Sequence, residues 1–220
     1  MIKKAFIFDL DGVVVDTAKF HFVAWQNLAS SLDINFTEEE NEQLKGVSRV
    51  RSLEKILEWG NKKIDKETFE QKLIQKNEEY LKMVETLDQK DILPGVYDFL
   101  IHLKKQDQPI ALGSASKNAR PILKKLGILN MFDAIVDGTD VSKAKPDPEV
   151  FLNACKLLNM PSENAIVFED SIAGIQAANI AGMISIGLGE EKNLSEADEV
   201  FRSFLDMPAD YQHQLLNKTK

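Results

Sequence analysis

The chain has 220 residues, of which 44% are hydrophobic and 28% are charged, a composition typical of a globular protein with a buried core. Its 27 basic and 35 acidic side chains give a net charge of −8, and no long run of one sign favours binding to nucleic acid or to an anionic membrane. No apolar run reaches the roughly 20 residues that a transmembrane helix needs.

The N-terminal segment and the single cysteine both favour an intracellular protein. Asp9 interrupts the first apolar run too early for a signal peptide, and no small-residue cleavage site follows. Cys155 lies in a helical pattern, where it is expected to be a small core residue rather than a nucleophile. We therefore expect a cytoplasmic monomer that binds small molecules and binds neither nucleic acid nor membrane.

Residues 5–10 are the first predicted element, a short apolar run typical of a buried parallel strand. Two carboxylates, Asp9 and Asp11, come at its end. Buried carboxylates are costly unless they are paired, hydrogen-bonded or bound to a metal. Since Gly12 follows Asp11, an ordinary turn explains the pair taken alone. The alternative is a phosphoryl-transfer site.

Residues 17–90 show helical patterns and no convincing strand. We predict helices over 17–32, from residue 37 onward, over 49–59 and over 65–84. Thr37 and Glu40 have the spacing of a capping box, and Ser48 is placed to cap the third helix. A helical block of about 70 residues therefore follows the first strand.

From residue 91 onward, apolar runs alternate with helical patterns. Strands are predicted over 109–114, 134–138, 165–170 and 183–189, and helices over 95–106, 118–126, 147–159 and 172–181. This alternation predicts an α/β fold with a doubly wound, mostly parallel sheet. Residues 1–16 and 91–220 would form the α/β core, and residues 17–90 would be an inserted helical domain.

Polar side chains follow the predicted strands at their carboxyl ends, the edge where open α/β sheets bind ligands. The sequence places there Asp9, Asp11, Ser114, Ser116, Lys117, Asn118, Lys145, Glu169 and Asp170. One aspartate would act as nucleophile and the other as acid and base, while a magnesium ion, a lysine and a hydroxyl offset the phosphoryl charge.

Two helices of the insert carry polar residues on otherwise apolar stripes. Thr17 and His21 begin the stripe of the first helix, at the end nearest Asp11. Lys76 lies between Leu73 and Tyr80 on the inward stripe of the long helix. Taken alone, Lys76 is typical of a surface lysine and His21 of a core histidine. Polar residues on a buried stripe usually have a partner, which here would be a ligand.

Four segments, FDLDGVVVDT, SASKN, KPDPEVF and EDSIAGIQAA, resemble in order and spacing the motifs of the haloacid dehalogenase superfamily of aspartate-based phosphotransferases. This resemblance implies a Rossmann-like core, with residues 17–90 as its small cap domain. It implies that Asp9 is the nucleophile, that Asp11 is the general acid and base, and that Ser114 and Lys145 hold the transferring phosphoryl group. It also implies one Mg²⁺, with ligands from Asp9, Asp170, Glu169 and the backbone carbonyl of Asp11.

Segments of the insert, FHFVAW, LKGVSR and QKNEEYLKM, resemble the hexose-phosphate mutases of that superfamily. This narrower resemblance implies interconversion of β-glucose 1-phosphate and glucose 6-phosphate, with glucose 1,6-bisphosphate as activator and intermediate. Thr17, His21 and Lys76 would orient Asp11 when the cap closes. The other implied contacts with the hexose phosphate are Trp25, Gly46, Val47, Ser48, Arg49, Ser116, Lys117 and Asn118.

Two other functions remain open at this point. A phosphatase for a small sugar phosphate or for phosphoglycolate would share the core motifs, although His21, Arg49 and Lys76 favour a sugar bisphosphate held at both ends. A catalytically inactive relative that binds phosphate as a sensor or scaffold is disfavoured because Asp9 and Asp11 are both present. Trp25 also fits the core of the cap as well as a sugar contact.

Overall fold

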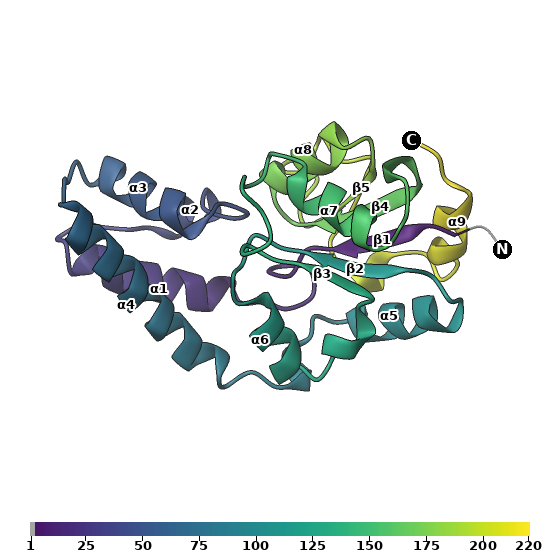
Figure 1. The fold of residues 1–220 in the computed structure, drawn as a ribbon, viewed down its shortest axis with the longest axis horizontal. Helices are drawn as coiled ribbons and strands as arrows, with labels where there is room; N and C mark the ends of the chain where they lie inside the picture. The colour runs from purple at the N-terminus through teal and green to yellow at the C-terminus, as the bar shows by residue number, and fades with distance from the viewer. Residues whose placement is uncertain (1–2) are drawn as a thin grey trace.

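A six-stranded parallel sheet lies at the centre of the computed structural model, which describes residues 3–220 (Figure 1). The strands are β1 (Ala5–Phe8), β2 (Ile110–Gly113), β3 (Ala134–Val136), β4 (Ala165–Glu169), β5 (Ile184–Leu188) and β6 (Glu199–Phe201). Their order is β3-β2-β1-β4-β5-β6, with every pair parallel. The predicted doubly wound fold is confirmed. The edge strand β6 was not predicted, because its three residues are half-buried and form no apolar run.

Both faces of the sheet are covered by helices. Alternate strand residues point to opposite faces, and in the central strands the residues on both faces are buried. Phe6 and Phe8 pack with α5 (Val96–Lys105), α6 (Ala119–Lys125) and α9 (Tyr211–Asn217). Ala5 and Ile7 pack on the other face with α7 (Glu149–Leu157) and α8 (Ile172–Ile180). Cys155 is buried in this second cluster, as predicted. Short 3₁₀ helices cover Gln89–Asp91, Leu129–Met131, Ser162–Asn164 and Phe204–Asp206.

Four helices are inserted between β1 and α5 and lie beyond the carboxyl end of the sheet (Figure 1). They are α1 (Ala18–Ser30), α2 (Glu38–Glu42), α3 (Arg49–Trp59) and α4 (Lys66–Val84). They enclose their own core, built on Trp25, Leu28, Leu53 and Ile56. Residues 17–90 contain no strand, as predicted.

Local capping explains where these inserted helices begin. Thr37 and Glu40 form the predicted capping box, and the Ser48 side chain accepts from the backbone of the first turn of α3. The predicted bounds of α3 are confirmed. Thr17 and Asp65 are N-cap residues rather than the first helical residues of α1 and α4.

The two connections between insert and sheet run side by side. Val15, leaving β1, forms an antiparallel bridge with Ile92, and Leu93 N donates to Val14 O at 2.9 Å. Because Val14 and Val15 are fully buried, these crossings fix where the insert leaves the core. The insert therefore stands over the strand ends that carry Asp9 and Asp11.

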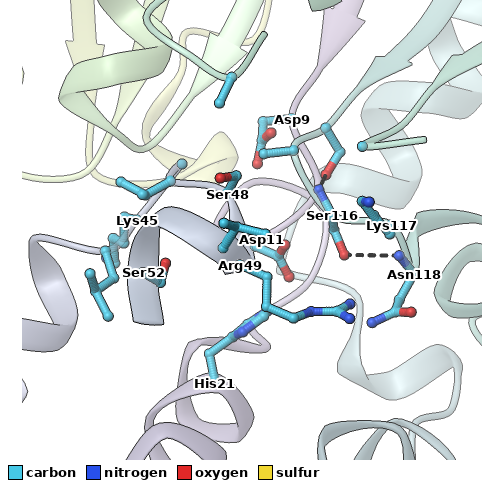
Figure 2. Close-up of a pocket in the computed structure, with 18 of the residues that line it drawn as sticks. Asp9, Asp11, His21, Lys45, Ser48, Arg49, Ser52, Ser116, Lys117 and Asn118 are labelled. Carbon is cyan, nitrogen blue, oxygen red and sulfur yellow. Dashed lines mark hydrogen bonds between the residues drawn. The ribbon is translucent and has the colours of Figure 1, made fainter. Parts of the chain in front are cut away.

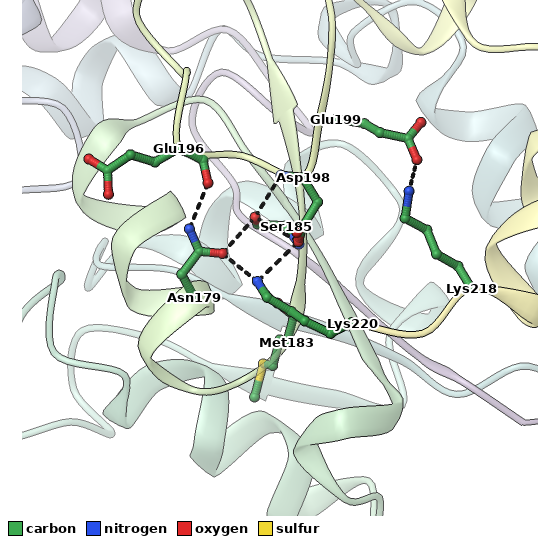
Figure 3. Close-up of polar contacts among 8 residues, drawn as sticks. All are labelled: Asn179, Met183, Ser185, Glu196, Asp198, Glu199, Lys218 and Lys220. Carbon is green, nitrogen blue, oxygen red and sulfur yellow. Dashed lines mark hydrogen bonds and ion pairs between the residues drawn. The ribbon is translucent and has the colours of Figure 1, made fainter.

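The C-terminal tail contacts the amino ends of β5 and β6, at the edge of the sheet away from the insert (Figure 3). Lys220 Nζ lies 3.0 Å from Asp198 Oδ2 and 2.5 Å from Met183 O, where β5 and β6 begin. Lys218 pairs with Glu199 beside it. The tail therefore stabilises the edge remote from the insert. Within residues 3–220, no helix combines the length and the hydrophobicity needed to cross a bilayer.

Candidate active site

A cavity of about 410 Å³ lies between the carboxyl edge of the sheet and the insert (Figure 2). This is the switch point of the sheet, where β1 separates β2 from β4 and ligands bind in open α/β folds. The predicted site residues that line it are Asp9, Asp11, His21, Trp25, Gly46, Val47, Ser48, Arg49, Lys76, Ser114, Ser116, Lys117, Asn118 and Asp170. Thr17, Lys145 and Glu169 do not line the cavity, but contact residues around it.

Lys145 joins two carboxylates from neighbouring strands. Its Nζ lies 2.5 Å from Asp9 Oδ1 and 2.5 Å from Glu169 Oε1, and all three side chains are buried. Burial alone would lower the pKa of Lys145, but the two carboxylates outweigh it and hold that pKa above its usual value. Burial raises the pKa of Asp9 to about 7, although Lys145 opposes this shift. Negative charge is therefore in excess here.

The chemistry of this cluster fits a divalent cation. Asp9, Glu169 and Asp170 each offer a carboxylate oxygen, and these oxygens lie within 4.8 Å of one another. Burial and the charge of Glu169 raise the pKa of Asp170 well above its usual range. A bound cation would stabilise the ionised form of this carboxylate. Gly12 has φ +82°, and a Cβ there would lie 2.2 Å from Asp170 Oδ2. A small residue therefore preserves the space around Asp170. Hard oxygen ligands are those that Mg²⁺ prefers.

Asp11 has a different environment from Asp9. Its carboxylate accepts a hydrogen bond from the hydroxyl of Thr17, the fully buried N-cap residue of α1. Burial raises the pKa of Asp11 above its usual value, opposed by the bond from Thr17. A carboxyl group that gains a proton more readily than an exposed one is suited to donate and recover it.

Lys76 is held inside the insert, as its place on the apolar stripe of α4 predicts. Its exposed fraction is 2%, its Nζ lies 2.8 Å from His21 Nδ1, and it stands 4.5 Å from the ring centre of Trp25. Burial, followed by the charge of Arg49, lowers the pKa of Lys76 to about 7. Burial and Lys76 lower the pKa of His21 well below its usual range, so the neutral imidazole accepts from the lysine.

Replacing Lys76 with methionine is expected to stabilise the folded protein by about 1 to 3 kcal/mol at and below neutral pH. Between pH 7 and pH 10 the unfolded chain binds a proton at this lysine that the folded chain lacks, so wild-type stability rises with pH across that window. Methionine removes this penalty, at the cost of the contact with Trp25.

Urea unfolding at several pH values measures this effect. The stabilisation should be largest below pH 7 and should fade toward pH 10. Lys82→Met, an exposed change on the same helix, should alter stability little at any pH. An unfolding free energy of Lys76→Met that parallels the wild type at all pH values would contradict the prediction.

The loop after β2 is ordered by its own side chains. Ser116 N donates to Ser114 Oγ at 3.1 Å, and Asn118 N donates to Ser116 Oγ at 3.2 Å (Figure 2). Across the cavity, no carboxylate within residues 3–220 pairs with Arg49, and burial lowers the pKa of this arginine. A guanidinium without an acidic partner beside polar loop side chains is suited to an anion such as phosphate.

Three residues near the site had no role in the sequence analysis. Lys45 Nζ lies 3.4 Å from Asp170 Oδ2, and Asn77 Oδ1 accepts from Asn118 Nδ2 at 2.9 Å. The Tyr80 side chain is buried, and its ring centre lies 4.2 Å from that of His21. All three lie in quoted segments of the insert, LKGVSR and QKNEEYLKM. Their closeness to Lys76 and Gly46 in sequence was the available signal.

Comparison with known proteins agrees with this geometry. Residues 3–182 match the family model of haloacid dehalogenase-like hydrolases. The chain is 41% identical to a β-phosphoglucomutase of Bacillus subtilis over 96% of this chain and 94% of that protein. It is 32% identical to a phosphorylated carbohydrates phosphatase of Thermotoga maritima over 90% and 92% of the two chains.

Among solved structures, the fold is similar to that of β-phosphoglucomutase from Clostridium difficile, with a TM-score of 0.94 and 42% identity. The match covers 98% of this chain and 97% of the other. Sheet and insert are therefore arranged alike in the two proteins.

Proposed function

Because the chain belongs to the haloacid dehalogenase-like hydrolase family, we propose that it is an isomerase with β-phosphoglucomutase activity. It would interconvert β-D-glucose 1-phosphate and glucose 6-phosphate through glucose 1,6-bisphosphate. The observation that carries the proposal is the side of the cavity formed by the insert, where no carboxylate of residues 3–220 pairs with Arg49 and the buried Lys76 contacts His21. A phosphoryl group held at Asp9 and a second phosphate near Arg49 account for both.

The reaction would begin with Asp9 phosphorylated. The 6-hydroxyl of β-glucose 1-phosphate attacks the phosphorus, the bond to Asp9 breaks, and Asp11 takes the hydroxyl proton. The bisphosphate then turns over in the cavity. Asp9 attacks the other phosphorus, the bond to sugar oxygen 1 breaks, and Asp11 returns its proton to that oxygen. Glucose 6-phosphate leaves, and Asp9 is phosphorylated again.

The remaining core residues would stabilise charge during these steps. Lys145 and Ser114 would hold the oxygens of the transferring phosphoryl group. Asp9, Asp170 and the Asp11 backbone carbonyl, supported by Glu169, would hold one Mg²⁺, which neutralises phosphoryl charge when bound. Glu169 is suited to support because Lys145 and Ser171 already engage both of its oxygens.

Residues 17–90 would act as a cap that closes over residues 1–16 and 91–220. Closure would place Thr17, His21 and Lys76 around Asp11, and Gly46, Val47 and Ser48 beside the sugar. Trp25, at the edge of the cavity, would limit its depth, and Ser116, Lys117 and Asn118 would hold the second phosphate with Arg49. A mutase must keep water from its phosphorylated aspartate, and a closed cap excludes water.

A sugar-phosphate phosphatase is the second candidate, because the relative from Thermotoga maritima is named a phosphorylated carbohydrates phosphatase and is 32% identical over 90% of this chain. In that case water would replace the sugar hydroxyl as acceptor from Asp9. The two functions differ in what receives the phosphoryl group, and that difference is measured directly in the products.

Product analysis by phosphorus NMR tests the proposal. The protein is incubated with Mg²⁺, β-glucose 1-phosphate and a trace of glucose 1,6-bisphosphate. We expect glucose 6-phosphate to accumulate with little inorganic phosphate. Inorganic phosphate as the main product would overturn the mutase function in favour of the phosphatase. We also propose that the enzyme is cytoplasmic and monomeric. Sedimentation of the purified protein tests whether it is a monomer.

A further inference from the structure

Lys45 connects the insert with the proposed metal cluster of the core. It lies in the loop between α2 and α3, and its Nζ is 3.4 Å from Asp170 Oδ2 and 3.0 Å from Glu42 Oε2. The Asp170 side chain is 10% exposed, and Lys45 is its one ion-pair partner within residues 3–220. This pair is therefore neither a simple surface contact nor part of one domain alone.

The backbone beside Lys45 packs closely on the core. Gly46 has φ +70°, and a Cβ at this position would lie 2.8 Å from Ser171 Oγ. Ser171 directly follows Asp170 and caps α8. The loop of the insert thus rests on the residue next to the proposed metal ligand, and the Lys45–Asp170 contact forms only when this loop sits on the core.

The Lys45 ammonium group and a divalent ion would both bind the Asp170 carboxylate. Lys145 pairs with Asp9 and Glu169, and Lys45 is the lysine that pairs with Asp170. A divalent ion held by Asp170 would stand within a few ångströms of the Lys45 ammonium group, and like charges at that distance repel. The ion pair and the bound ion therefore oppose each other.

We propose that Lys45 is a latch that couples the position of the cap to divalent-cation binding at Asp170. When Lys45 pairs with Asp170, the loop is held on the core; when a divalent ion binds Asp170, the loop is released and the cavity opens to sugar phosphate. Coupling of this kind is reciprocal. The Lys45–Asp170 pair lowers the affinity for the divalent ion, and the bound ion weakens the pair by the same factor. The proposal rests on the magnesium site of the proposed function.

The test compares Mg²⁺ binding to the full chain with Lys45→Met by isothermal titration calorimetry. We expect methionine to lower the Mg²⁺ dissociation constant about 5- to 20-fold, within the usual range of coupling between sites. Lys45→Arg keeps the charge and should remain close to the wild type. Lys143→Met is the matched control, since Lys143 also lines the cavity but pairs with Asp147. It should change the dissociation constant less than about 2-fold.

Small-angle X-ray scattering separates a latch from a general effect of charge. Mg²⁺ should expand the wild type and leave the dimensions of Lys45→Met unchanged, because its loop is already released. Equal or weaker Mg²⁺ binding by Lys45→Met, or the same expansion in both proteins, would overturn the latch. A wild type that binds no Mg²⁺ would instead overturn the metal site of the proposed function.

Discussion

Replacement of Asp9 by asparagine is expected to reduce turnover by about 10⁴-fold or more, because the amide is not a nucleophile and forms no acyl phosphate. Folding should be affected far less. Asparagine matches aspartate in shape, and Lys145 keeps its 2.5 Å contact with Glu169. Burial makes the Asp9 charge costly in the folded protein, so its loss offsets part of the lost ion pair.

Two measurements check this expectation together. Steady-state assays of glucose 6-phosphate formation report turnover, and intact-protein mass spectrometry after incubation with glucose 1,6-bisphosphate reports the phosphorylated enzyme. The wild type should gain the mass of one phosphoryl group and Asp9→Asn none. Asp98→Asn, an exposed change on α5, should behave as the wild type. Turnover retained in a clean Asp9→Asn preparation would falsify the assignment of Asp9 as nucleophile.

Replacement of Asp11 by asparagine is expected to lower turnover of the sugar phosphate by about 10² to 10⁴-fold, the usual contribution of a positioned acid and base. The amide cannot protonate the leaving sugar oxygen or deprotonate the attacking hydroxyl. Since the Asp11 side chain bonds to Thr17 and lies outside the carboxylate cluster, its replacement should leave Mg²⁺ binding largely intact.

The choice of phosphoryl donor gives this prediction its control. Acetyl phosphate has a good leaving group that needs little protonation, so Asp11→Asn should still be phosphorylated on Asp9 by this donor. The loss of rate should therefore be large with glucose 1,6-bisphosphate and small with acetyl phosphate. Equal losses with both donors would show that Asp11 positions the phosphoryl group or the metal instead of moving a proton.

The order of strands and helices could be predicted from the sequence because the signals are local. Apolar runs such as 5–10 and 165–170 mark buried strands wherever they lie in the chain. Ser48 and the Thr37–Glu40 pair mark helix starts through hydrogen bonds within one turn. A parallel sheet then brings the carboxyl ends of its strands to one edge, and the pairing of β1 with β4 makes Asp9 and Glu169 neighbours there.

The polar residues on apolar stripes were also visible in the sequence, although their partners were not. Helical periodicity predicts that Lys76 points inward, and it is 2% exposed. Periodicity within one helix does not show which side chain on another helix it meets. The contact with His21 depends on how α1 packs against α4, which joins residues 55 positions apart.

The fold class, the helical insert and the set of polar residues at the carboxyl edge of the sheet could be predicted from the amino-acid sequence. The contacts across the cavity, such as Lys45 with Asp170 and Asn77 with Asn118, became visible only in the folded structure. Strand positions and helix starts follow from short-range patterns in the chain. The seating of the insert on the core depends on the shape and charge of surfaces assembled from distant segments.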